Sequence, residues 1–103
     1  MLKVMFVCCA GMSTSLLVEK VNEVAKSKGL DIEVYAMGET EAKKDLAQAD
    51  ILLLGPQVRY MESGFRKTIG DAKTKLGVVD MRAYGNMDGE KVLAQILELS
   101  EQS

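Results

Sequence analysis

The 103-residue chain contains no histidine. Its own side chains therefore cannot form a Ser–His–Asp triad, a Cys–His dyad, a histidine-ligated metal site or a phosphohistidine carrier. Its two cysteines, Cys8 and Cys9, are adjacent, and neighbours in sequence cannot close a loop with a disulfide. Two thiols without a histidine also make a poor zinc site. We expect neither a metal nor a disulfide framework.

Clustered charge and long apolar runs are also missing. The chain has 13 basic and 15 acidic residues, a net charge of −2 and no block of like charge. This excludes a nucleic-acid-binding arm and a polybasic membrane anchor. The apolar run Val4–Met12 is much shorter than the roughly 20 residues that span a bilayer, and it lacks the features of a cleaved signal. We expect a cytoplasmic protein with one domain over residues 1–103 and no direct membrane insertion.

The hydrophobic period alternates between that of strands and that of helices. Strands are predicted at Leu2–Val7, Asp31–Ala36, Ile51–Leu54 and Leu76–Asp80. Helix faces are predicted from the spacing of Leu17, Val21 and Val24, of Ala42, Leu46 and Ala49, of Met61, Phe65 and Ile69, and of Val92, Ile96 and Leu99. The order βαβαβαβα predicts an α/β domain with a four-stranded, parallel, open sheet and helices on both faces.

Local signals refine these elements. Gly29 is expected to stop the first helix, Thr40 to be the N-cap of the second, and Asp88 to cap the last near its start. The four consecutive aliphatic residues Ile51–Leu54 are typical of a strand that is buried on both faces.

The loop after the first strand is the strongest candidate site, because parallel sheets bind ligands beyond the carboxyl ends of their strands. The loop begins at Cys8, continues through Cys9, Ala10, Gly11, Met12, Ser13, Thr14 and Ser15, and leads into the first helix. The free N–H groups and the dipole of a helix N-terminus bind anions. Gly11 lets the backbone curl, and the three hydroxyl residues are expected to cap the helix or to donate to bound oxygens.

A thiol at the mouth of such a loop is expected to have a lowered pKa and to be nucleophilic, which makes Cys8 the candidate acceptor of a phosphoryl group. For Cys9, packing or oxidation is the favoured interpretation over a chemical role.

Other enzymes and modules on similar folds are less consistent with these residues. The loop resembles that of tyrosine phosphatases in length, but Thr14 stands where those enzymes have a phosphate-clamping arginine. A carrier therefore fits better than a hydrolase, and a low-molecular-weight phosphatase or arsenate-reductase-like enzyme using Cys8 is the alternative. A receiver domain would need acidic residues at Val7–Cys9 and an aspartate near Leu54. A redox module would need C-x-x-C spacing.

Several segments resemble one known family. Val7–Leu17 closely resembles the phosphocysteine loop of the IIB components of the bacterial phosphoenolpyruvate-dependent sugar phosphotransferase system, in the lactose/cellobiose/diacetylchitobiose branch. Ala49–Met61 is similar to that branch's third strand and following loop, and Val79-Asp80 with Tyr84–Gly89 to its last strand and the turn into the final helix. The resemblance covers essentially the whole chain.

The resemblance implies a phosphotransferase that receives a phosphoryl group from a phosphohistidine on a IIA partner and holds it on Cys8. The group then passes to a disaccharide bound by the membrane-embedded IIC partner. No cofactor is implied beyond this covalent group. The backbone from Cys9 to Ser15 would cradle the phosphoryl oxygens, Met12 would contact both partners, and Gln57 and Tyr60 are secondary candidates for the rim of the site. We expect a monomer.

Overall fold

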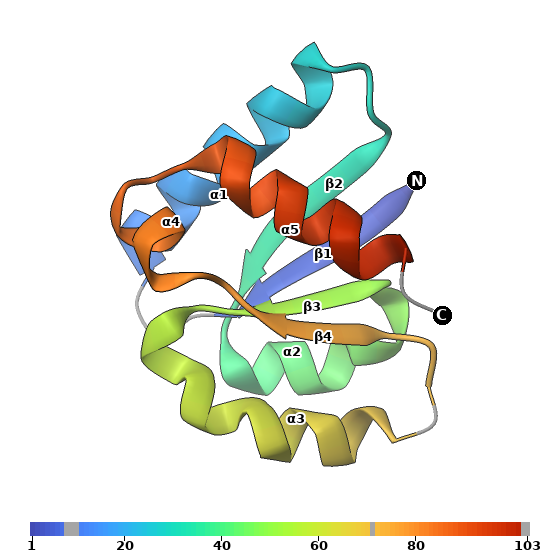
Figure 1. Cartoon of the computed structure of the whole chain (residues 1–103). Coiled ribbons are helices and arrows are strands. Elements are labelled where there is room, and N and C mark those ends of the chain that lie inside the picture. Colours follow the sequence, from blue (N-terminus) through green and yellow to red (C-terminus); the bar gives the residue numbers. More distant parts are fainter. Residues whose placement is uncertain (8–10, 71, 102–103) are drawn as a thin grey trace.

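The computed structural model describes residues 1–7, 11–70 and 72–101, with residues 11–14 described through their backbone alone. Its strands are β1 (Leu2–Val7), β2 (Ile32–Met37), β3 (Ile51–Leu54) and β4 (Lys75–Val78). Its α-helices are α1 (Gly11–Ser27), α2 (Glu39–Asp45), α3 (Glu62–Ile69), α4 (Met81–Gly85) and α5 (Gly89–Glu101), with the 3-10 helices η1 (Leu46–Gln48) and η2 (Pro56–Met61). Figure 1 shows their arrangement.

The four strands form one parallel sheet in the order β2-β1-β3-β4. Val4 of β1 lies in register with Val34 of β2 on one side and Ile51 of β3 on the other. The central strand β3 is at most 1% exposed at every residue, Ile51–Leu54. This confirms the prediction of a strand buried on both faces, as expected where helices cover both sides of a parallel sheet.

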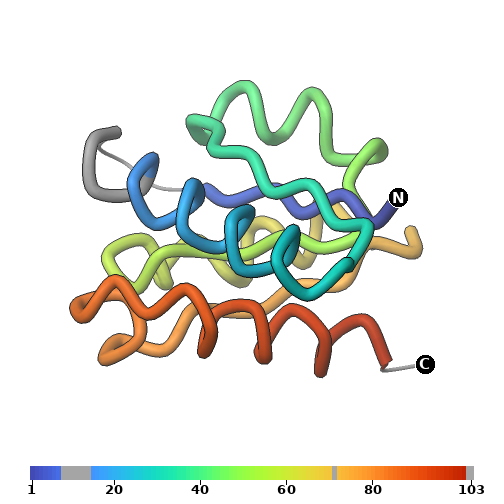
Figure 2. Tube along the Cα trace, turned by 90° about the horizontal axis from the view of Figure 1, so that it is seen from above, coloured from blue at the N-terminus to red at the C-terminus, as the bar shows by residue number. Residues whose placement is uncertain are grey.

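Two helical layers enclose the sheet, with α1 and α5 on one face and α2 and α3 on the other (Figures 1 and 2). Successive residues of a strand point to opposite faces. Accordingly, Val4 and Phe6 of β1 belong to the core under α1 and α5, whereas Met5 and Val7 belong to the core under α2 and α3. The predicted α/β architecture with a four-stranded parallel sheet is confirmed.

The end of α1 matches the sequence signal. Gly29 has φ +70°, a left-handed conformation that glycine adopts without steric cost. The N–H of Leu30 donates to the carbonyl of Ala25 at 2.9 Å, and the N–H of Gly29 donates to that of Lys26 at 3.1 Å. This pair of bonds is a Schellman motif, so the prediction that Gly29 stops the helix is confirmed.

The start of α2 corrects the prediction for Thr40. The N-cap is Gly38, with extended backbone at φ −75° and ψ 164°, and Thr40 is the second residue of the helix. Strand β2 continues to Met37, and only one residue then separates strand from helix. The carbonyl of Gly38 accepts from the N–H of Ala42 at 2.9 Å, so the helix begins before a threonine cap is reached.

The segment after β4 holds a helix that the hydrophobic pattern did not reveal. Helix α4 has five residues, which is too short for a 3.6-residue period to show. The Asp80 carboxylate caps it by accepting from the N–H of Ala83 at 3.0 Å. The predicted cap at Asp88 is confirmed, because its Oδ1 accepts from the N–H of Lys91 at 3.1 Å in the first turn of α5.

Candidate functional site

The strand order places the topological switch point between β1 and β3. The chain leaves β1 toward β2 on one side and returns across β1 to β3 on the other, and ligands bind at such a point beyond the carboxyl ends of the strands. Cys8, Cys9 and Ala10 follow β1 in the sequence, and they lie outside the described residues. The residue before them is firmly placed, because the carbonyl of Val7 accepts from the N–H of Gly55 at 3.0 Å.

The other flank of this loop is the N-terminus of α1. The helix begins at Gly11 and has 17 residues, so its positive dipole end directly follows residues 8–10. Ser13, Thr14 and Ser15 lie inside the helix, so none of them occupies the N-cap position and the capping prediction is wrong. Their donation to bound oxygens stays a prediction. Met12 also lies in the first turn. In the sequence only Cys9 and Ala10 separate Cys8 from the helix N-terminus at Gly11, and helix N-termini are places where anions bind.

Helix α1 is anchored so that its start is held against the sheet. Leu17 and Val21 are fully buried in the core that α1 shares with α5. A Cβ at Gly89 would lie 3.1 Å from the backbone carbonyl of Lys20, so α1 and the first residue of α5 approach each other closely. The fixed helix gives the loop after β1 a defined endpoint.

The two secondary candidates lie on η2, directly after β3. Gln57 is exposed and Tyr60 is 73% exposed, whereas Val58 between them is fully buried and anchors the segment. The Tyr60 side chain is thus mostly outside the packed core. Because Gly55 bonds to Val7, η2 begins at the same edge of the sheet as the loop that contains Cys8. A role for Gln57 and Tyr60 at the rim stays a prediction.

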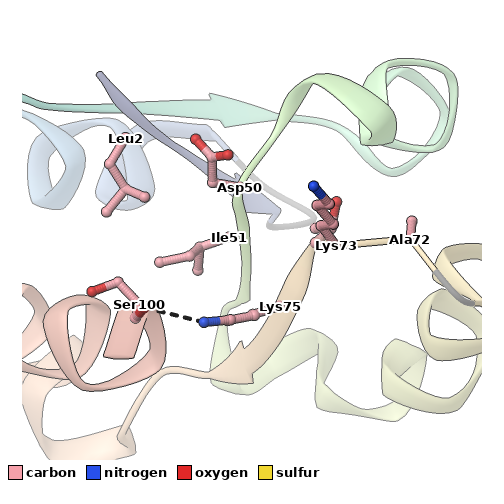
Figure 3. A pocket seen from close by; sticks show the side chains of 8 residues that line it. Leu2, Asp50, Ile51, Ala72, Lys73, Lys75 and Ser100 are labelled. Atoms are coloured by element: carbon pink, nitrogen blue, oxygen red, sulfur yellow. Dashed lines mark hydrogen bonds between the residues drawn. The ribbon is translucent and has the colours of Figure 1, made fainter. Parts of the chain in front are cut away.

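A hollow of about 580 Å³ lies at the opposite, amino-terminal edge of the sheet. Figure 3 shows that Leu2, Asp50 and Ile51 form one side and Lys73 another. The Lys75 ammonium group donates to the backbone carbonyl of Ser100 at 3.1 Å. Because the strands begin here, this hollow is not the predicted phosphoryl site.

Among residues 1–7, 11–70 and 72–101, no group of three or more His, Cys, Asp or Glu side chains is placed so that it could hold a metal ion. Within the same ranges, no helix combines the length and apolar character needed to cross a membrane.

Comparison with known proteins identifies the family. The family model for the lactose/cellobiose-specific IIB subunit of the PTS matches residues 3–95. The chain is 42% identical over 99 residues to the oligo-beta-mannoside-specific EIIB component of Bacillus subtilis, covering 96% of each chain. It is also 42% identical over 92 residues to the cellobiose-specific EIIB component of Lactococcus lactis, covering 84% of this chain and 85% of that one.

Solved structures agree with this result. The solution structure of the cellobiose-specific IIB component from Borrelia burgdorferi is similar at a TM-score of 0.75 and 31% identity, over 95% of this chain and 90% of that one. The lactose-specific IIB domain from Streptococcus pneumoniae has a TM-score of 0.83 and 18% identity, over 97% and 98%, and supports the fold alone. The chain belongs to the lactose/cellobiose-specific IIB family of the sugar phosphotransferase system, whose members are phosphotransferase components.

Proposed function

We propose that this protein is a phosphoryl carrier in which Cys8 receives a phosphoryl group from a phosphohistidine on a IIA subunit and passes it to a sugar held by a membrane IIC subunit. One observation supports the proposal most: the chain passes from Val7, at the switch point of the sheet, to the N-terminus of α1 at Gly11 through three residues, of which Cys8 is the first. A candidate nucleophile is thus close in sequence to a helix N-terminus, a place where anions bind, in a chain of the IIB family.

The proposed first step exchanges one phosphorus bond for another. The Cys8 sulfur attacks phosphorus, an S–P bond forms, and the P–N bond to the donor imidazole breaks with its electron pair remaining on nitrogen. The proton that the thiol gives up ends on that imidazole, so the carrier loses one proton, the donor gains it, and the pair together neither gains nor loses a proton. Backbone N–H groups over residues 9–15 would bind the phosphoryl oxygens and stabilise the charge that develops on them.

The residue content favours transfer to a sugar over hydrolysis. The chain has no histidine, and position 14 is threonine where tyrosine phosphatases have arginine. Without a bidentate guanidinium on the transferring group, hydrolysis lacks a charge-assisted clamp. The phosphatase or arsenate-reductase-like alternative would need that clamp and an acid to protonate its leaving group.

We infer the class of transported sugar from the sugars for which the similar EIIB components are named. The similar EIIB components are specific for oligo-beta-mannoside, cellobiose and galactose, so we assign a β-linked disaccharide or galactoside as the transported sugar. We propose that the carrier acts as a monomer in the cytoplasm, where it would relay the phosphoryl group toward the permease. Its formal class is protein-phosphocysteine–sugar phosphotransferase.

Intact-mass analysis tests the acceptor. The protein is incubated with phosphoenolpyruvate, the general phosphotransferase proteins and a lactose/cellobiose-type IIA. Wild type and Cys9→Ser should each gain one phosphoryl group, and Cys8→Ser should gain none. An adduct on Cys8→Ser, or no adduct on wild type while the IIA is charged, would overturn the proposal.

A further inference from the structure

Large hydrophobic side chains are exposed mainly at one end of the molecule. Among the described side chains, four are prominent in this respect, and one of these is the N-terminal Met1. The other three are Leu16 at 47%, Tyr60 at 73% and Met81 at 65% exposure. They lie in α1, η2 and α4, the elements that directly follow β1, β3 and β4. We call these three residues the apolar rim.

Two arginines flank the apolar rim. Arg59 precedes Tyr60 on η2 and Arg82 follows Met81 on α4, and both are exposed. Neither guanidinium makes an ion pair or a side-chain hydrogen bond with the described part of the chain. Both arginines thus carry positive charge that this part of the protein does not compensate.

Three carboxylates near the same edge already have partners other than these arginines. Glu62 pairs with Arg66 at 2.6 Å and Glu39 with Lys43 at 3.2 Å. The carboxylate of Asp80 caps α4. None of these three groups pairs with Arg59 or Arg82. The edge thus combines apolar area with two arginines that make no ion pair within the described residues, although the whole chain has a net charge of −2.

We propose that the apolar rim, with Arg59 and Arg82, is the docking surface for the phosphohistidine-bearing donor, a IIA subunit that presents an apolar centre flanked by carboxylates. The proposal rests on the proposed function. Exposed aromatic and arginine side chains are the residue types that dominate binding energy at protein interfaces. A lipid surface does not fit, because polybasic lipid sites use clusters of about four to eight Lys or Arg.

The charge at the edge favours the donor over the acceptor. The donor arrives while Cys8 is unmodified, when the two arginines are uncompensated and attract the phosphoryl anion and neighbouring carboxylates. After transfer, this chain itself carries a phosphate of charge about −1.5 to −2. That charge compensates the arginines, weakens the attraction to the donor and promotes its release. The IIC acceptor meets this chain only after transfer, when the phosphate offsets the charge of the two arginines.

The test separates binding of the donor from the chemistry at Cys8. Transfer from a phosphorylated lactose/cellobiose-type IIA of the same organism is followed against IIA concentration. Tyr60→Ser should raise KM about tenfold with little change in kcat, as for loss of an interface anchor. The double variant Arg59→Gln/Arg82→Gln should raise KM about tenfold at low salt and flatten its rise with salt, because screening acts on the lost charges.

Matched controls exclude a general loss of structure or charge. Tyr60→Phe keeps the aromatic ring and should keep the wild-type KM. Lys67→Gln/Lys73→Gln removes two exposed positive charges elsewhere, on α3 and before β4, and should leave both constants unchanged. An unchanged KM for IIA in Tyr60→Ser and in Arg59→Gln/Arg82→Gln would overturn the docking proposal. It would also be overturned if these variants slowed only the later transfer of the phosphoryl group to a IIC-bound sugar. Failure of the wild type to accept phosphoryl from the IIA would instead overturn the proposed function.

Discussion

The side-chain amide of Asn22 bonds to both backbone groups of Val34. Its Nδ2 donates to the Val34 carbonyl at 2.8 Å, and its Oδ1 accepts from the Val34 N–H at 2.9 Å. Val34 lies on β2, an edge strand, so helix α1 satisfies backbone groups that face away from β1. The same contact ties α1, whose N-terminus follows Cys8, to the sheet.

The opposite edge of the sheet is closed in a similar way. On β4, the Gln95 amide of α5 donates to the carbonyl of Val78 at 2.6 Å, and its Oε1 accepts from the N–H of Asp80 at 3.4 Å. Unpaired edge strands are sites of aggregation that proteins cover. Here one helix of the same layer covers each edge with an amide side chain.

The first prediction is that Asn22→Asp destabilises the fold. Aspartate keeps the acceptor for the Val34 N–H, but it removes the donor and places a carboxylate beside the Val34 carbonyl. We expect the free energy of unfolding to fall by about 1–3 kcal/mol. Urea unfolding measures this change. Asn22→Gln is the comparison variant, because it keeps the amide group on a side chain that is one methylene longer. A loss in Asn22→Asp below about 0.5 kcal/mol, the range of ordinary surface substitutions, would contradict this role.

The sequence predicted the layers of this fold, but not the hydrogen bonds at the sheet edges or the cap of α2. The order of the four strands and the helices α1, α2, α3 and α5, and the buried strand Ile51–Leu54, follow from the hydrophobic pattern alone, whereas the short helices η1, η2 and α4 do not. The bonds of Asn22 and Gln95 could not be predicted, because each joins a helix to a strand 12 to 17 residues away. The cap of α2 was missed because Gly38 supplies a backbone carbonyl and no recognisable side-chain signal.

The candidate site was predictable where it depends on topology. The position of Cys8 after the first strand and before the first helix follows from the order of elements. The part of the apolar rim formed by Leu16 and Met81 could not be predicted, because the exposure of a hydrophobic side chain depends on tertiary packing. Leu16 and Leu17 are adjacent in sequence, yet one is 47% exposed and the other fully buried.

The second prediction concerns glycines in different surroundings. A Cβ at Gly77 would lie 2.7 Å from Cδ1 of Leu99, so Leu99 must shift, and Gly77→Ala should cost about 1–2 kcal/mol of stability. A Cβ at Gly64 in α3 meets nothing within 4 Å. Gly64→Ala should therefore stabilise the protein by about 0.5–1 kcal/mol, because alanine favours the helix.

Denaturant unfolding of both variants checks this prediction. In a Leu99→Val background, which lacks the colliding Cδ atoms, the cost of Gly77→Ala should shrink. An equal cost in both backgrounds would show that Leu99 is not the cause. Loss of stability in Gly64→Ala would contradict the open surroundings of that residue.

The third prediction concerns stability at alkaline pH. Burial, followed by the negative charges of Glu33, Asp45 and Asp50, raises the pKa of Tyr35 above its usual 10.0. The unfolded chain therefore loses this proton at lower pH than the folded chain does. The stabilising contribution is complete below about pH 10 and is lost as the pH rises through the folded-state pKa.

Urea unfolding across the alkaline range measures this loss. Tyr35→Phe has no phenol to ionise, so its stability should fall less steeply above pH 10 than that of the wild type. Parallel slopes for wild type and Tyr35→Phe would contradict the raised pKa.

The most direct test of the carrier role follows the phosphoryl group after it has reached Cys8. Phosphorylated protein is freed from IIA and divided between buffer alone and membrane vesicles that contain the IIC permease and a β-linked disaccharide. A carrier should keep its phosphoryl group in buffer and lose it to the sugar in the vesicles, with one sugar phosphate formed for each group lost. Rapid release of inorganic phosphate in buffer, without sugar phosphate in the vesicles, would contradict the account and identify a hydrolase.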